Sequence, residues 1–112
     1  MEYKLSISLL LFLLATFSIA ADEKIHIKNG DVLSGDILRK DAQSFIISCP
    51  HGLYRVPIEL INDMQFDGKA FRMFDFSGKS SIIHPLKLHS STLETKEGSL
   101  PLSSIEKLYR ID

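Results

Sequence analysis

The stretch "IHIKNGDVLSGDI", Ile25 to Ile37, decides the fold. Apolar and polar residues alternate at its start, and this period of two predicts a strand with one buried face. Asn29-Gly30 then suits a two-residue type I′ hairpin, which needs positive φ at both central positions. The alternation resumes after Asp31, and Gly35 in the returning strand predicts a bulge or a sharp bend, because glycine has no side chain to pack. The stretch therefore predicts a hairpin whose second strand curls.

The next thirty residues or so extend this hairpin with further short strands. "SFIIS" (44–48) and "LYRV" (53–56) are rich in β-branched and aromatic residues, and the turn between them ends at Gly52. Pro57 ends the second of these strands, because proline has no N–H for a central ladder. "IELI" (58–61) is too short for a stable helix and predicts one tight turn before a closing strand in "DMQF" (63–66).

The second half of the chain echoes the first. "FRMFDFSGKSSII" (71–83) predicts a strand, a turn at Ser77-Gly78 and a return strand, and residues 91–111 follow the plan of residues 44–66. Gly98 corresponds to Gly52, Pro101 to Pro57, Ile105 to Ile61 and Leu108 to Met64, at separations of 46, 44, 44 and 44 residues. A nearly constant period indicates internal duplication. The alternative is that glycine and proline fall at the turns of any all-β chain.

The predicted fold class is therefore all-β, with two tandem small five-stranded barrel-like units after an N-terminal signal helix. The first unit spans residues 21–67, and the second, more divergent unit spans residues 68–112, where Pro85 interrupts a strand. The connection "MQFDGKAFRMFDF" (64–76) is too apolar for a free linker, so we expect the units to pack through it. Its aromatic residues are expected to fill the core where the units meet: Phe66, Phe71, Phe74 and Phe76.

Residues 1–20 have the layout of a secretory signal peptide. A short n-region with Lys4 precedes an apolar core, and Ser18-Ile19-Ala20 gives the small-x-small pattern of a cleavage site after Ala20 or Ala21. The protein is thus predicted to be exported, to the periplasm or beyond the cell. The alternative is an uncleaved membrane anchor, whose apolar span of residues 5–21 is marginal against the ~20 residues that a spanning helix needs.

Charge and cysteine content narrow the classes of partner. The net charge of the 112 residues is −1, which gives no strong overall field for nucleic acid or anionic lipid. We therefore expect no nucleic-acid partner, and membrane contact only if the N-terminal segment stays attached. Cys49 is the only cysteine, so no disulfide forms within the chain, and its thiol is either buried or free to pair with another chain.

The first unit resembles small secreted bacterial modules of the Sm-like or Src-homology-like β-barrel type. Their pattern is an apolar strand, Asn-Gly-Asp, a bent strand centred on glycine, a glycine turn, and a strand ending in proline before a short turn. The matching residues are Asn29, Gly30, Asp31, Gly35, Gly52, Pro57 and Ile61. The resemblance covers residues 24–66 well and residues 70–111 loosely, where Ser77-Gly78-Lys79 replaces Asn-Gly-Asp and the turn positions are Gly78, Gly98 and Pro101. It implies a non-catalytic part of the bacterial envelope and no known ligand contacts.

No residue pattern predicts catalysis. "CPHG" (49–52) resembles the first three residues of the Cys-Pro-His-Cys site of periplasmic disulfide oxidases, but Gly52 replaces the second cysteine and no helix follows. The histidines are scattered without the converging spacing of a zinc site: His26, His51, His84 and His89. The carboxylates sit at predicted turns or alternate with apolar residues, as structural residues do. We predict no catalytic residues, no metal and no cofactor.

The leading hypothesis is a non-enzymatic exported binding or scaffold module of the bacterial cell envelope. It would bind an envelope protein, or a second copy of itself, through strand edges or a groove. The alternatives are a membrane-anchored accessory subunit, if the N-terminal segment is not cleaved, and a metal-dependent enzyme.

Overall fold

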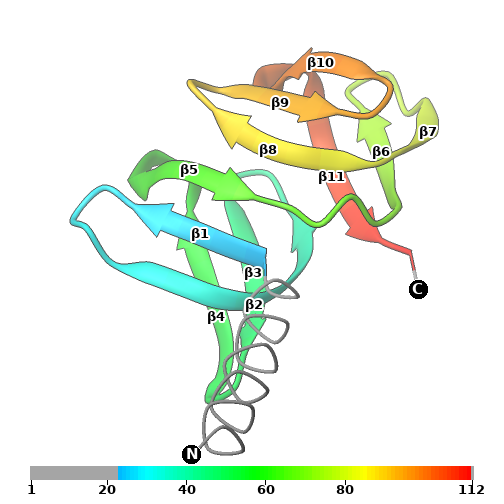
Figure 1. Ribbon diagram of the computed structural model, residues 1–112. Coiled ribbons are helices and arrows are strands. Elements are labelled where there is room, and N and C mark those ends of the chain that lie inside the picture. The colour runs from blue at the N-terminus through cyan, green and yellow to red at the C-terminus, as the bar shows by residue number, and fades with distance from the viewer. Residues whose placement is uncertain (1–22, 112) are drawn as a thin grey trace, which may run out of the picture.

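The computed structural model describes residues 23–111, and the predicted signal peptide lies outside this range. The described chain is all-β, as predicted, and its eleven strands form one curled antiparallel sheet that resembles a half-barrel (Figure 1). Two short 3₁₀ turns, η1 and η2, interrupt it. None of the described helical segments is long and apolar enough to span a bilayer.

Residues 23–65 and residues 71–110 each begin with a hairpin and end with a 3₁₀ turn followed by a closing strand, and we refer to them as the N-terminal and C-terminal halves. The N-terminal half contains β1 (Glu23–Ile27), β2 (Val32–Lys40), β3 (Ser44–Cys49), β4 (Gly52–Pro57), η1 (Ile58–Leu60) and β5 (Ile61–Gln65). The C-terminal half contains β6 (Phe71–Asp75), β7 (Ser80–Ile83), β8 (Pro85–His89), β9 (Thr92–Thr95), β10 (Gly98–Pro101), η2 (Leu102–Ser104) and β11 (Ile105–Arg110).

The long strand β2 curls because it changes partner at its centre. Its residues up to Gly35 pair with β1, and its residues from Asp36 onward pair with β3. Gly35 lies so close to β3 that a Cβ atom there would stand 2.0 Å from the backbone oxygen of Ser48. The sharp bend predicted at Gly35 is therefore present, and glycine is needed there because the close approach of the two backbones leaves no room for a side chain.

The C-terminal half makes the same change of partner with a broken strand. β7 pairs with β6, β8 pairs with β9, and the break between them falls at His84, just before Pro85. The predicted interruption at Pro85 is thus confirmed.

The first hairpin turn differs from the prediction. A type I′ turn needs positive φ at Asn29 as well as Gly30, but of these two only Gly30 has it, at +99°. The N–H of Gly30 donates to the Ile27 oxygen at 2.9 Å, and the N–H of Ile27 donates to the Asp31 oxygen at 2.8 Å. This is a three-residue loop that ends in a left-handed glycine. Gly78, with φ of +89°, closes the β6–β7 turn through the same pair of hydrogen bonds.

The closing strand of each half pairs with both halves. β5 pairs with β1 of its own half and with β8 of the other half, and β11 pairs with β6 of its own half and with β2 of the other half. In Figure 1, β5 accordingly lies alongside β8 between the two halves. The sheet therefore runs unbroken from one half into the other.

One hydrophobic core serves both halves. Phe66 and Phe71, on either side of the connection, are buried and pack edge to face with ring centroids 5.8 Å apart, as predicted. The prediction was wrong for the other two aromatic residues of this segment. Phe76 is 70% exposed in the β6–β7 turn, and Phe74 lies beside Tyr109 on the outward side of the sheet, with ring centroids 6.0 Å apart.

Candidate functional site

Three of the described strands have one side without a neighbouring strand: β4, β7 and β10. Such an edge exposes unpaired backbone N–H and C=O groups that can accept a strand from another chain. β10 is four residues long and begins Gly-Ser, and β7 is also four residues long. β4 is longer, at six residues, and offers the most complete docking edge.

The β4 edge also carries exposed apolar side chains. Leu53 is 67% exposed and Tyr54 is 43% exposed, on consecutive residues whose side chains point to opposite sides of the sheet. An exposed, apolar edge strand is a liability in a monomer, and natural proteins usually blunt such edges with charge or proline. Here Pro57 lies only at the end of the strand, and the one charged residue of β4, Arg55, is ion-paired with Asp41 of the same chain, so most of the edge stays open.

A hollow of about 640 Å³ lies at the far end of β4. Its walls come from the β2–β3 loop, the end of β4 and the start of η1: Ala42, Gln43, Ser44, Arg55, Pro57, Ile58 and Glu59. Arg55 forms an ion pair with Asp41 and donates a hydrogen bond to the Ser44 hydroxyl at 3.1 Å. The hollow therefore has a fixed polar wall next to the open edge.

Hydrogen bonds hold Asp41 in its charged form. Burial acts to raise the pKa of Asp41, but hydrogen bonds from the Gln43 N–H, the Arg55 guanidinium and Ser44 outweigh it and lower the pKa to about 2. The Asp41 carboxylate accepts the Ser44 N–H and hydroxyl at 3.0 Å each. This loop is thus ordered by its own carboxylate at neutral pH.

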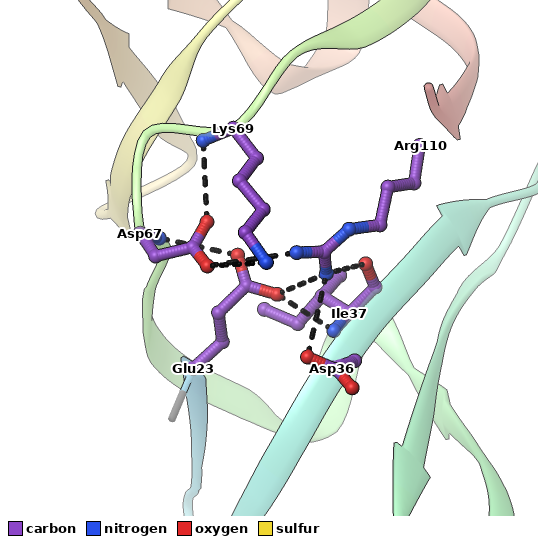
Figure 2. Close-up of polar contacts among 6 residues, drawn as sticks. All are labelled: Glu23, Asp36, Ile37, Asp67, Lys69 and Arg110. Carbon is purple, nitrogen blue, oxygen red and sulfur yellow. Dashed lines mark hydrogen bonds and ion pairs between the residues drawn. The ribbon is translucent and has the colours of Figure 1, made fainter. Parts of the chain in front are cut away.

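A buried charge cluster joins the first strand to the last (Figure 2). Glu23 at the start of β1 is 1% exposed, and its carboxylate accepts a hydrogen bond from Arg110 of β11 at 2.8 Å. It also accepts the backbone N–H groups of Ile37 at 2.8 Å and Asp67 at 3.1 Å. Arg110 in turn donates to the Ile37 oxygen at 3.1 Å and lies 3.5 Å from the Asp67 carboxylate. The cluster links β1, β2, β11 and the connection between the halves.

Two opposed effects act on the carboxylates of this cluster. Burial raises the pKa of Glu23, and the N–H groups of Ile37 and Asp67 and the charge of Arg110 only partly offset it. At Asp67 burial also acts to raise the pKa, but the Lys69 N–H, the contact with Glu23 and the charge of Arg110 outweigh it, so the pKa is lowered. The cluster is fully occupied by its own hydrogen bonds, which indicates a structural role.

Lys40 makes a second polar link between the halves. Its ammonium group is buried and donates to the backbone oxygens of Ile105 at 2.9 Å, Asp41 at 3.1 Å and Glu106 at 3.3 Å. Burial lowers the pKa of Lys40. Sequence reasoning missed both links, because lysine, glutamate and arginine at these positions look like ordinary surface residues of strands.

The residues predicted to mark turns and bends all lie at such places. Asn29, Gly30 and Asp31 form the β1–β2 loop, and the Asn29 side chain bonds to Asp31 at 2.9 and 3.0 Å. Gly52 and Gly98 begin β4 and β10 with φ of +141° and +138°. Pro57 and Pro101 end these strands immediately before η1 and η2. These residues shape the chain and do not converge on one site.

Cys49 lies at the end of β3, partly buried and packed against the core. Burial raises the pKa of its thiol, which lowers the fraction of reactive thiolate. Within residues 23–111, no three histidine, cysteine or acidic side chains are placed to hold a metal ion. His26 and His89 are the register partners of Asp63 on either side, with His26 within 3.8 Å of its carboxylate, and His84 lies within 2.6 Å of Glu97.

Comparison of the chain with protein-family models, curated proteins and solved structures finds no match.

Proposed function

We propose that this chain is a non-enzymatic, exported binding or scaffold module of the bacterial cell envelope. It takes up an extended segment of a partner, or of a second copy of itself, along the free edge of β4. The observation that carries this proposal is the six-residue edge of β4 with the exposed side chains of Leu53 and Tyr54. A strand added there would gain backbone hydrogen bonds from the edge and side-chain contacts on both sides of the sheet.

We further propose that the chain consists of two tandem Sm-like or Src-homology-like units. The repeated order of elements supports this, because each half has a hairpin, a strand that changes partner, a two-residue turn before a glycine, and a proline before a 3₁₀ turn.

Site-specific crosslinking tests the edge. A photoreactive residue at position 54 should capture the partner in intact cells. The same residue at position 86 should capture nothing comparable, because Leu86 is equally exposed, at 42% against 43% for Tyr54, but lies on β8, which is paired on both sides. Adding Leu53→Lys should abolish capture at position 54, because a charge on an edge strand opposes pairing. Equal capture at both positions would refute the proposal, and a product of twice the chain mass would identify the partner as a second copy.

A further inference from the structure

A row of six side chains crosses the outward side of the sheet. Residues that are register partners on adjacent strands project their side chains to the same side. Reading the register from β7 through β6, β11, β2 and β3 to β4 gives Ile82, Arg72, Tyr109, Arg39, Ile46 and Arg55. Apolar or aromatic and basic residues alternate along this row.

The row lies on the side opposite the core. Tyr109 is 39% exposed, whereas Leu108 before it is fully buried, and Arg72 follows Phe71, which is also fully buried. Ile46 is buried but does not belong to the core cluster. Its register neighbours are Arg39 and Arg55, and long basic side chains lay their aliphatic stems along apolar surface in this way.

Two further residues enlarge the row on the C-terminal half. Phe74 and Lys107 are register partners, and each lies two residues from a member of the row on its own strand. A shallow depression of about 320 Å³ lies among Phe74, Tyr109 and Lys107. We call Ile82, Arg72, Tyr109, Arg39, Phe74 and Lys107 the arginine–tyrosine face.

The cations of this face are not neutralised by the described part of the chain. Arg39, Arg72 and Lys107 form no ion pair with any residue of 23–111, and Arg72 makes only a 3.5 Å hydrogen bond to Ser80. Asp75 and Glu106 also border the depression, so two carboxylates stand beside the three cations of the face. A chain of net charge −1 thus carries a local excess of positive charge on one side.

We propose that the arginine–tyrosine face binds the surface of an anionic lipid bilayer. Its cations complement lipid phosphates, and Tyr109 at 39% exposure and Ile82 at 48% exposure supply apolar surface for the interface. Exposed apolar residues interspersed with unpaired cations are typical of such surfaces. Single-stranded nucleic acid fits less well, because the rings of Phe74 and Tyr109 meet at 80° and so offer no parallel platform for stacked bases. This proposal is independent of the β4 edge.

Vesicle co-sedimentation tests the proposal on protein exported and purified from the same host, with the N-terminus of every variant checked by mass spectrometry. The probes are phosphatidylcholine vesicles with and without phosphatidylglycerol. The test variant combines Arg39→Gln, Arg72→Gln and Lys107→Gln. Each basic residue near an anionic surface contributes roughly fivefold to partitioning, so the variant should bind anionic vesicles roughly 100-fold more weakly. Wild-type binding should also fall with rising salt.

The matched control removes three lysines elsewhere, by Lys24→Gln, Lys28→Gln and Lys87→Gln, and so changes net charge equally. It should keep wild-type binding, and circular dichroism should show both triple variants folded. Equal loss in both triple variants would refute the proposal, as would wild-type binding that ignores phosphatidylglycerol. Tighter binding to a single-stranded oligonucleotide than to the vesicles at the same salt would assign the face to nucleic acid instead. Leu53→Gln removes an exposed apolar side chain of the β4 edge without changing the net charge, and it should leave vesicle binding unchanged, so failure of this proposal and failure at the β4 edge are distinguishable.

Discussion

Replacing Arg110 with methionine removes the only cation that lies within hydrogen-bonding distance of Glu23 among the described residues. Glu23 would keep its hydrogen bonds from the Ile37 and Asp67 N–H groups but would remain a buried carboxylate without its charge partner. Breaking a buried ion pair on one side costs about 3–5 kcal/mol. For a domain of this size each 1 kcal/mol lowers the melting temperature by about 4–8 °C, so we expect a fall of at least about 12 °C.

The pH dependence of this variant provides a second, sharper readout. Losing Arg110 removes a charge that lowers the pKa of Glu23, so the pKa, already raised by burial, rises further. A group whose pKa is raised on folding stabilises the protein fully when the pH is below the pKa of the unfolded state, here near 4.5. This stabilisation is lost as the pH rises through the pKa of the folded state. The deficit of Arg110→Met relative to wild type should therefore be smaller at about pH 5 than at about pH 8.

Urea denaturation at the two pH values, followed by circular dichroism, measures both effects. Arg72→Met is the matched control, because Arg72 lies exposed on the neighbouring strand β6, and it should change stability by less than about 0.5 kcal/mol. Adding Glu23→Gln to Arg110→Met should recover part of the loss, because a neutral amide costs less to bury unpaired than a carboxylate. An Arg110→Met variant as stable as wild type at both pH values would show that the cluster contributes nothing to stability.

Three further predictions concern single positions. Gly35→Ala should lower the free energy of unfolding, measured by urea denaturation, by about 3 kcal/mol, because its Cβ would meet the Ser48 oxygen. Gly30→Ala should lower it by only the ~1 kcal/mol of a left-handed alanine, because its Cβ would meet no atom within 4 Å. Equal losses would contradict the close approach at Gly35. In an NMR titration Asp41 should show a pKa of about 2, and a normal pKa would show that the loop hydrogen bonds do not persist. A carboxylate whose folded pKa is lowered stabilises the protein above its unfolded pKa, here 3.8, and that stabilisation is lost as the pH falls toward 2. The free energy of unfolding of Asp41→Asn should therefore depend less on pH between 3.8 and 2 than that of the wild type. Cys49 should react with a disulfide reagent more slowly in the native state than in urea, and equal rates would mean that its thiol is not protected.

Local sequence signals predicted much of the fold. The alternation before Asn29, the bend at Gly35, the 3₁₀ turn after Pro57 and the interruption at Pro85 each depend on a few adjacent residues, and each was found. The turn at Asn29 was predicted in the right place with the wrong geometry, because Asn-Gly also suits a three-residue loop with only the glycine left-handed.

Contacts between distant residues could not be predicted. Glu23 and Arg110 are 87 residues apart, and nothing near either one indicates that β1 and β11 both pair with β2. The same holds for Phe74, whose outward position depends on the register of β6 with β11, and a shift of one residue would have turned it into the core. The arginine–tyrosine face was invisible for the same reason, since its members come from four strands.

The pairing of β5 and β11 with the opposite half has a consequence for refolding. Until both halves have formed, β5 and β11 each have one unpaired side, because their partners β8 and β2 belong to the other half. A neighbouring molecule carries the same partner strands. The connection of residues 66–70 favours the partner within the same chain only through the effective concentration that a short tether creates, of the order of millimolar. Refolding from denaturant at high protein concentration should therefore yield domain-swapped dimers, separable from the monomer by gel filtration, and dilution should suppress them.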